Sequence, residues 1–379
     1  MELNLSADHL ALQSAVRDFA QSVVKPMAPR TDREHRFPRE AISAAAELDL
    51  MGILIPAEYG GAGLDHLAFT LCIEEIAAVC ASTAVIVDVH NSVAAEPILL
   101  FGTEEQKRRW LPALASGELL GAFALTEPSS GSDAGALRMT ARRRGDSYLL
   151  NGTKVFITIV GEAGLYIVFA RTGSQSGASG VSAFLVPGDS PGLRPGQMFT
   201  KMGLNGSPTG ELILEDVEVP ATNLLAPEGE GFRVAMRALD SGRIGISAQA
   251  LGIARAALEE SLTYTQEREQ FGQRIADFQG VNWMLADMAT RLEAARQMTY
   301  HAAALCSAGQ PFTKEASMAK LFTTDTAMSI AIDAVQLAGG YGFIVDYPFE
   351  RHFRDAKACQ IYEGSNQIQR IVIAREILR

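Results

Sequence analysis

The strongest constraint on the fold of this chain is a change in the spacing of its apolar residues, which occurs twice along 379 residues. From about 6 to 117 the apolar residues recur every three or four positions, which is typical of amphipathic helices. From about 118 to 227 they alternate with polar residues between frequent turn residues, which is typical of strands. Helical spacing returns after a glycine-containing hinge at 229–231 and continues to the C-terminus. The first helical stripe is Leu12, Val16, Phe19 and Val23.

This pattern predicts an α+β protein that is mainly α. We expect an N-terminal helical domain at 1–117, a middle β domain at 118–227 and a C-terminal helical bundle domain at 228–379. Few helices interrupt the strands, so an antiparallel barrel or sandwich is favoured over a parallel doubly wound sheet. Long amphipathic helices joined by short loops favour a bundle at the C-terminal end.

Two short segments of the middle domain carry turn signals. Asn151-Gly152 lies between two alternating runs and predicts a type I′ hairpin, because both central residues of that turn need a positive φ. The run Arg142-Arg143-Arg144 could bind a phosphate. Because it precedes Gly145-Asp146, the solvated end of a hairpin is the favoured interpretation.

Charge and cysteine content exclude some classes of function. Lys and Arg number 33 and Asp and Glu 44, so the net charge of −11 disfavours nucleic acid or an anionic membrane as the main partner. The cysteines form no C-x-x-C pair and no metal-ligand spacing, so we expect reduced core thiols and no metal site. The start lacks a secretory signal, so we expect a cytoplasmic protein, or a mature organellar matrix form without its targeting segment. The cysteines are Cys72, Cys80, Cys306 and Cys359.

The common nucleotide and zinc motifs G-x-G-x-x-G, G-x-x-x-x-G-K-[ST] and H-E-x-x-H do not occur, and two other segments stand out. The first, LTEPSSGSDAG at 125–135, is either a plain polar loop or a Gly/Ser-rich loop whose N–H groups and hydroxyls hold a phosphate. The second, RHFRDAKACQIYEGSNQIQR at 351–370, places Ser365 where it can cap a helix. That helix N-terminus is either simply capped or receives an anionic group.

Together these segments resemble the acyl-CoA dehydrogenase family, flavoenzymes that form an α,β-double bond in an acyl-CoA thioester. The resemblance runs from the first helix to Arg379 and is closest to short-chain or short-branched (butyryl-CoA) members. It implies an α-helical domain, a middle antiparallel β-barrel-like domain and a C-terminal four-helix bundle. The motifs that carry it are Leu125-Thr126-Glu127-Pro128, Gly131-Ser132-Asp133, Gly135, Arg354-Asp355-Ala356, Ile361-Tyr362-Glu363-Gly364 and Gln367-Ile368-Gln369-Arg370.

The resemblance implies that Glu363 is the base that removes the pro-R α-proton while a hydride leaves the β-carbon for flavin N5. General-base assistance is worth about 3–5.5 kcal/mol, and an oxyanion donor about 2.7–4 kcal/mol. The resemblance assigns that donor role to the Glu363 N–H and a flavin ribityl hydroxyl. Burial should raise the pKa of Glu363 more than a helix N-terminus lowers it. One branch of the family carries its base on another helix, where Gly242 here has no carboxylate.

The remaining contacts implied by the resemblance concern FAD and the CoA thioester. Positions matching flavin contacts are Phe123, Leu125, Thr126, Gly131, Ser132, Phe156 and Thr158, with Ser365 and Gln367 at the second motif. Positions matching contacts from a neighbouring subunit are Arg268, Phe271, Gln279, Gln336, Leu337, Gly339 and Gly340. Positions matching substrate contacts are Ser132, Asp240, Arg243 and Gly364. Without the motif, the two phenylalanines of the β domain would be strand core residues, and Asp240 with Arg243 a structural ion pair.

Two departures from the family pattern affect the flavin site. Ile159-Val160 replaces the usual Asn-Gly after Thr158, so the loop behind the flavin should differ. Ser129-Ser130 replaces a commoner Gly-Ala pair, and its hydroxyls can alter the dinucleotide-binding turn.

The resemblance also implies partners and alternatives. It predicts an acyl-CoA substrate, a homotetramer, and electron-transferring flavoprotein as electron acceptor. An acyl-CoA oxidase that uses dioxygen is the closest alternative, although such enzymes are generally much longer. A catalytically silent acyl-CoA or flavin-binding scaffold is the other alternative, and it predicts loss of the base or of the flavin contacts.

Overall fold

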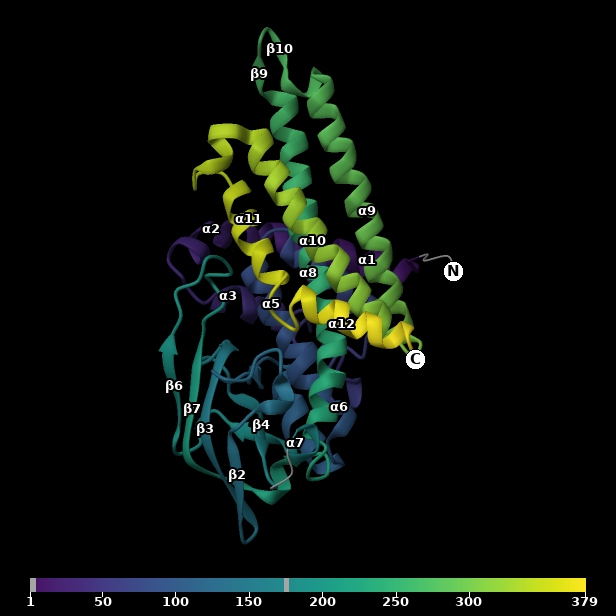
Figure 1. Cartoon of the computed structure of the whole chain (residues 1–379). Coiled ribbons are helices and arrows are strands. Elements are labelled where there is room, and N and C mark those ends of the chain that lie inside the picture. The colour runs from purple at the N-terminus through teal and green to yellow at the C-terminus, as the bar shows by residue number, and fades with distance from the viewer. Residues whose placement is uncertain (1–4, 174–176) are drawn as a thin grey trace.

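The computed structural model describes residues 5–173 and 177–379. Figure 1 shows helices at both ends of the chain and a sheet between them, so the predicted order helical, β, helical is confirmed. The N-terminal elements are α1 (Ala7–Phe19), η1 (Ala20–Val24), α2 (Lys25–Arg33), α3 (Arg39–Ala46), η2 (Ala57–Tyr59), α4 (His66–Ala77), α5 (Ala81–Val89), η3 (His90–Ala95), α6 (Glu96–Phe101) and α7 (Glu104–Ala115).

The first helix, α1, begins directly after Ser6, close to where the helical spacing of the sequence begins. The Ser6 side chain accepts a hydrogen bond from the His9 N–H, and the His9 ring meets the Ser6 backbone N–H, which together form a capping box. Val16 and Phe19 of the predicted stripe are buried in the core. Local capping and apolar spacing therefore agree at this helix.

The middle domain is one eight-stranded sheet in the order β6-β7-β3-β2-β4-β5-β8, with β1 added beside β4. Most neighbouring strands are antiparallel, as predicted. The sheet is nevertheless mixed, because β1 runs parallel to β4 and a single β2–β4 pairing is also parallel. The strands are β1 (Gly121–Ala124), β2 (Thr140–Arg144), β3 (Ser147–Thr158), β4 (Leu165–Arg171), β5 (Val181–Pro187), β6 (Leu193–Met198), β7 (Thr209–Pro220) and β8 (Leu224–Leu225). Short helices η4 (Ala134–Ala136), η5 (Ala178–Gly180) and η6 (Ala221–Asn223) interrupt them.

The hairpin predicted at Asn151-Gly152 is wrong. These residues lie inside β3, where the register with β7 shifts between Leu150 and Gly152, and Gly152 has φ 148°. The Asn-Gly signal marks a bulge here instead of a turn. The turn falls earlier, at Gly145-Asp146 between β2 and β3, and the exposed Arg142-Arg143-Arg144 run ends the hairpin as favoured from the sequence.

The C-terminal part is helical, and its centre is the 37-residue helix α8. This helix packs against α4, α5, α9, α10 and α11, so it joins the N-terminal helices to the C-terminal ones. In Figure 1, α8, α9 and α10 form a column that ends at the β9–β10 hairpin, far from the sheet. The elements are α8 (Gly231–Glu267), β9 (Glu269–Gln270), β10 (Gln273–Arg274), η7 (Ile275–Asp277), α9 (Gln279–Ser307), α10 (Thr313–Ala338), η8 (Gly339–Phe343), α11 (Phe349–Cys359) and α12 (Asn366–Ile377).

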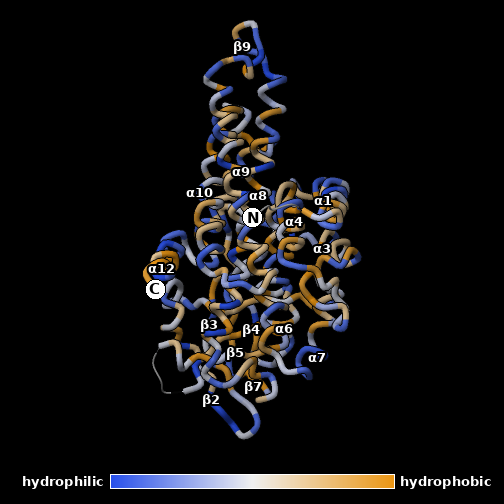
Figure 2. Tube along the Cα trace, turned by 90° about the vertical axis from the view of Figure 1, so that its right-hand side faces the viewer, coloured by the Kyte–Doolittle hydropathy of each residue, from blue (hydrophilic) through white to orange (hydrophobic). Residues whose placement is uncertain are grey.

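The apolar residues collect inside the helical body and between the helices and the sheet, as the orange segments in Figure 2 indicate. The stretch Ala81–Phe101 is long and apolar enough to cross a membrane, but most of it is buried in this core. Core helices of folded domains have the same character. All four cysteines are buried and free, as the sequence predicts.

Candidate active site

Glu363 lies in the short connection between α11 and α12, in a turn with unusual backbone geometry. Its φ is 51° and that of Gly364 is 91°, so two successive residues occupy the left-handed region. The residue is half-buried, yet both carboxylate oxygens are covered and have no hydrogen-bond partner in the part of the chain that the structure describes. Buried polar atoms normally have partners, so an orphaned carboxylate indicates a group kept free for a ligand.

The backbone of this turn is held from two sides. Gln369 Nε2 donates to the Gly364 carbonyl at 2.8 Å and to the Glu363 carbonyl at 3.3 Å. Lys320 Nζ donates to the same Gly364 carbonyl at 2.8 Å. Side chains from α12 and α10 therefore fix the turn that carries the carboxylate.

The capping role predicted for the Ser365 side chain is wrong. Ser365 occupies the N-cap position of α12, but its side chain makes no capping hydrogen bond to any described residue. The helix start is held by the Asn366 side chain, which donates to Thr324 Oγ1 at 2.9 Å and to Asp325 Oδ1 at 2.7 Å. Hydrogen bonds to α10 therefore hold the start of α12 in place of a local side-chain cap.

Burial dominates the ionisation of Glu363, as expected from the sequence. It raises the pKa of the carboxyl from 4.5 to about 7, and the positive charges of Lys320 and Arg243 oppose that rise. The opposing charges thus come from two buried side chains that the sequence analysis did not single out for this role. A carboxyl with this pKa can accept a proton near neutral pH.

Two glycines of α8 make room for buried carboxylates. A Cβ at Gly242 would lie 1.9 Å from Glu363 Oε2, and a Cβ at Gly245 would lie 2.0 Å from Asp88 Oδ1. Gly242 therefore faces the predicted base directly. A side chain at this position and the Glu363 carboxylate compete for the same space.

Asp88 is a second buried carboxyl that sequence reasoning missed. Ser92 Oγ donates to Asp88 Oδ1 at 2.8 Å, whereas Oδ2 has no partner among the described residues. Burial, and then the negative charge of Glu363, raise the pKa of Asp88 well above its usual range. Of the two carboxyls, Asp88 is the one whose pKa is raised by the charge of the other. In the sequence, the feature that could have identified Asp88 is an acidic residue within the apolar run that begins at Ala84.

The positions matched to flavin contacts on β1 and β3 line an accessible region. Phe156 is 65% exposed with φ 57°, and its ring lies 5.1 Å from that of Phe199. It is therefore no core residue, unlike the ordinary inward-facing phenylalanine of a strand. Phe123 is half-buried against Phe169, and Thr158 is half-buried opposite Thr209.

The loop that follows β1 exposes Gly131 and Ser132 at its turn. Ser130 is buried, and its hydroxyl donates to the Asp133 carbonyl at 2.6 Å, so this departure from the family pattern braces the turn. The other departure, Ile159-Val160, is buried, and Ile159 has φ 53°, which is a strained conformation for a β-branched residue.

A buried ion pair anchors this loop to β3, and the sequence analysis did not predict it. Lys154 Nζ lies 2.8 Å from Glu127 Oε1 and donates to the Leu125 carbonyl at 2.9 Å. The Glu127 carboxylate also accepts the backbone N–H groups of Arg138 and Met139 at 2.6 and 2.9 Å. Burial lowers the pKa of Lys154 to about 8, against the opposing effect of Glu127.

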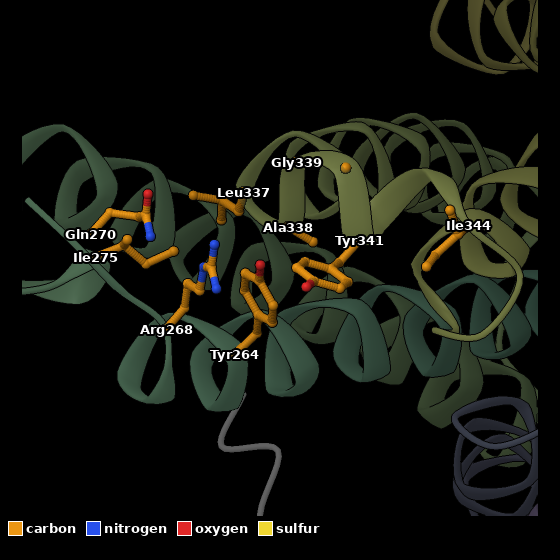
Figure 3. Close-up of a pocket in the computed structure, with 10 residues that line it drawn as sticks. Tyr264, Arg268, Gln270, Ile275, Leu337, Ala338, Gly339, Tyr341 and Ile344 are labelled. Atoms are coloured by element: carbon orange, nitrogen blue, oxygen red, sulfur yellow. The ribbon is translucent and has the colours of Figure 1, made fainter.

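The positions predicted to act from a neighbouring subunit gather at the far end of the α8–α10 column. Arg268 projects into a cavity of about 410 Å³, with its guanidinium 5.7 Å from the centre of the Tyr341 ring (Figure 3). Phe271 is 95% exposed. The cavity is lined by Tyr264, Arg268, Gln270, Ile275, Leu337, Ala338, Gly339, Gly340, Tyr341 and Ile344. Gln279 and Gln336 are exposed nearby, at the start of α9 and the end of α10.

One chain does not bring all the predicted cofactor contacts together. The β9–β10 hairpin beside Arg268 lies at one end of the molecule and β3 lies toward the other (Figure 1). Gln367 is exposed on α12 near Glu363.

Asp240 and Arg243 form an ion pair on α8, as one of the two sequence interpretations held. Thr313 Oγ1 donates to Asp240 Oδ2 at 2.7 Å, and Arg243 Nε has no partner among residues 5–173 and 177–379. The positive charge of Arg243 also opposes the rise in the pKa of Glu363. Its contact with CoA stays a prediction.

The donor set fits an organic anion better than a metal. In the described ranges no three His, Cys, Asp or Glu side chains group closely enough to hold a metal ion. The cavity beside Arg268 instead offers a guanidinium and the open backbone of Gly339 and Gly340, where an added Cβ would meet nothing within 4 Å. Such a surface suits a diphosphate, and exposed Phe156 suits a planar ring.

Comparisons with known proteins cover nearly the whole chain. Family models for the acyl-CoA dehydrogenase N-terminal, middle and C-terminal domains match residues 6–118, 122–217 and 229–378. An acyl-CoA dehydrogenase of Bacillus subtilis is 51% identical over 376 residues, 99% of each chain. The chain belongs to the acyl-CoA dehydrogenase family. As an acyl-CoA dehydrogenase it is an oxidoreductase that acts on a CH–CH bond.

Two solved structures place this acyl-CoA dehydrogenase within the family. Butyryl-CoA dehydrogenase from Megasphaera elsdenii superposes with a TM-score of 0.98 at 42% identity, with 100% of both chains covered. A chain solved in work on the electron transferring flavoprotein of Acidaminococcus fermentans and flavin-based electron bifurcation superposes with a TM-score of 0.99 at 49% identity, again over 100% of both chains.

Proposed function

We propose that this acyl-CoA dehydrogenase binds FAD and converts a short-chain or short-branched acyl-CoA to the trans-2-enoyl-CoA, with Glu363 as the base. The observation that carries the proposal is the Glu363 carboxylate, which is covered from solvent and has no partner within the described residues. Similarity to butyryl-CoA dehydrogenase supports a four-carbon or similar acyl group.

Glu363 suits removal of a weakly acidic α-proton. Its pKa of about 7 means that a large fraction is ionised at neutral pH while its basicity exceeds that of an ordinary carboxylate. The substrate would displace remaining water, which strengthens the electrostatic interactions around the carboxylate. Bound FAD would supply the acceptor for the hydride that leaves the β-carbon.

The Glu363 turn also presents a donor for the thioester oxygen. The Glu363 backbone N–H makes no hydrogen bond to the rest of the described chain. The positive φ of Glu363 and Gly364 re-aims this peptide away from the regular path of α12. A fixed N–H that meets developing enolate charge contributes about 2.7–4 kcal/mol to the transition state.

Residues from two copies of the chain would hold FAD. Phe123 of β1, Thr126 of the loop after β1, and Phe156 and Thr158 of β3 would contact the ring, and Ser132 would contact the diphosphate. Arg268 and the Gly339-Gly340 backbone would approach from the column of a neighbouring copy, since they lie far from β3 in their own chain (Figure 1). We therefore infer an oligomer, with the homotetramer as the expected form.

We infer that an electron-transferring flavoprotein takes the electrons. The similarity to a chain from work on such a flavoprotein supports this acceptor over dioxygen. The test compares turnover with electron-transferring flavoprotein and with oxygen alone. Faster turnover with oxygen alone would favour the oxidase.

Glu363→Gln tests the base. The variant should bind FAD to the same occupancy as the natural protein and lose at least about 10²-fold in kcat with butyryl-CoA, because the amide cannot accept the α-proton. Glu58→Gln, an exchange at an exposed position of η2, is the control. Near-normal kcat in Glu363→Gln refutes the assignment, and an absence of flavin in the natural protein would favour the silent scaffold.

A panel of CoA thioesters from four carbons upward tests the acyl group. We expect kcat/KM to be highest for four- and five-carbon straight or branched chains. A maximum at eight or more carbons would refute short-chain specificity while leaving the role of Glu363 intact.

A further inference from the structure

Lys320 is a buried cation next to the catalytic turn. Its side chain is 0% exposed in α10, and its Nζ donates to the Gly364 carbonyl at 2.8 Å and to Asn366 Oδ1 at 3.1 Å. Both acceptors are uncharged. Across the described ranges Lys320 forms no ion pair with a carboxylate.

A buried ammonium without a counter-ion is costly, because water is lost and no direct negative charge replaces it. Burial accordingly lowers the pKa of Lys320 to about 8, and electrostatic interactions with Cys359, Glu363 and Asp325 oppose the fall. An apolar side chain of similar volume at this position would stabilise the fold as well as the buried ammonium does, so stability alone does not explain the lysine. Its position therefore points to the group on which its charge acts.

The charged and titratable groups around this turn come from several elements. Among the positive charges acting on Glu363, Lys320 has the largest effect and Arg243 of α8 the next. Burial raises the pKa values of Asp88 of α5, Tyr362 and Cys359 above their usual values. Asp325 of α10 contacts Asn366 and Arg370. Of the two carboxylates that act on the pKa of Lys320, Glu363 has a larger effect than Asp325.

We propose that Lys320 is a positioning residue for the base, which fixes the Glu363–Gly364 turn through the Gly364 carbonyl and stabilises the ionised carboxylate of Glu363. The inference rests on the proposed function of Glu363. It adds a residue that touches neither the acyl group nor the flavin.

The geometry of the turn explains why such a residue is needed. Glu363 is a non-glycine residue in the left-handed region, and such conformations persist only where the surroundings impose them. The Gly364 carbonyl accepts from Lys320 and Gln369 together, so it is clamped between α10 and α12. Removing the ammonium releases one side of this clamp and removes the strongest positive charge acting on the carboxylate.

Three substitutions separate the hydrogen bond from the charge. Lys320→Met removes both, Lys320→Gln keeps a donor without charge, and Lys320→Arg keeps the charge. Lys314→Met, on the exposed part of the same helix, is the matched control. Each is studied as the FAD-loaded oligomer, with FAD content and thermal unfolding recorded first.

The readout is the titration of Glu363 itself. The infrared band of its protonated carboxyl, assigned by its loss in Glu363→Gln, gives the midpoint without turnover. We expect this midpoint to rise by about one pH unit or more in Lys320→Met and Lys320→Gln and to stay near its natural value in Lys320→Arg and Lys314→Met. The acidic limb of kcat/KM for butyryl-CoA should move with it, with about a tenfold loss at pH 6 that is recovered at higher pH.

An unchanged midpoint in Lys320→Gln overturns the inference, as does a loss of kcat/KM that is equal at every pH. If Lys320→Met does not fold, the Gln and Arg variants decide the question. Failure of the proposed function can be distinguished from failure of this inference. If Glu363 is not the base, Glu363→Gln stays active, whatever the infrared titration of Glu363 shows.

Discussion

At the scale of single residues, the site depends on positions where a side chain is missing as much as on those where one is present. Gly242 and Gly245 lie one turn apart on α8 and admit the carboxyl groups of Glu363 and Asp88. The sequence analysis used Gly242 only as evidence that no second base exists. The structure adds that this glycine provides the space that the base occupies.

Gly242→Ala should separate activity from stability. The added Cβ would lie 1.9 Å from Glu363 Oε2 and 3.0 Å from Val93 Cγ1, so the Glu363 side chain must move aside and Val93 must shift by a few tenths of an ångström. A gain of up to about 1 kcal/mol in helix propensity offsets this strain, so the fold should tolerate the change. The displaced base should lose about 10²-fold in kcat with butyryl-CoA. Kinetics and urea unfolding check this, with Gly280→Ala as the control because its added Cβ meets nothing within 4 Å. Full activity in Gly242→Ala would show that Glu363 works in a different position.

Asp88→Asn should stabilise the protein at neutral pH. Folding raises the pKa of Asp88, so the native state binds a proton that the unfolded state has released, and stability falls as pH rises from the unfolded pKa through the folded one. The asparagine variant lacks this dependence. Its unfolding free energy should exceed that of the natural protein by at least about 1 kcal/mol at pH 8 and by less at pH 5. A gain that is equal at both pH values would contradict a protonated Asp88.

At the scale of elements, much of the fold follows from local patterns, and the exceptions have physical causes. The capping box at Ser6 and the apolar stripe of α1 agree with the structure because both signals are local. The Asn151-Gly152 prediction was wrong because a β-bulge, like a type I′ turn, accepts glycine at positive φ. Pairing of β3 with β7 selects the bulge over the turn. Ser365 misled because Asn366 is anchored by residues of α10, which no local pattern reveals.

The motif pointed to Glu363 as the predicted base, and Arg243 was named as a substrate contact, whereas Lys320 and Asp88 were not singled out. Lys320 lies on the buried side of α10 with Ala316 and Ala327. A lysine among the apolar residues of this helix face was the sequence feature that could have identified it. Asp88 gave a similar signal in α5. Such residues are recognisable as exceptions to a helical pattern, but their partners come from other elements and need the tertiary structure.

The anchor between the first motif and β3 yields a prediction at this scale. Lys154→Met should cost about 3 kcal/mol or more of unfolding free energy, because it leaves the Glu127 carboxylate buried without its cation. Lys154→Met with Glu127→Gln should be less destabilised than Lys154→Met alone, since the uncompensated charge is removed. Urea unfolding of the single and double variants checks the order. A larger loss in the double variant would contradict this explanation.

At the scale of the whole molecule, the separation of Arg268 from β3 predicts complementation between chains. Glu363→Gln keeps Arg268, and Arg268→Ala keeps Glu363, so each variant alone should be nearly inactive. Hybrid oligomers of the two should regain about a quarter or more of normal activity, because sites with one intact half from each chain form. Co-expression with two different affinity tags and kinetic assay of the doubly tagged species measure this. Hybrids no more active than their parents would place the complete cofactor site within one chain.

The same separation carries a consequence for dilution. Figure 1 shows β3 and the β9–β10 hairpin far apart in one chain, so if FAD is shared between chains as proposed, a solitary chain completes no cofactor pocket. Retention of the prosthetic group then depends on how many chains are present, and loss of colour on dilution should follow mass action with protein concentration. Abundance thus sets both the number of catalysts and the fraction of them that is competent.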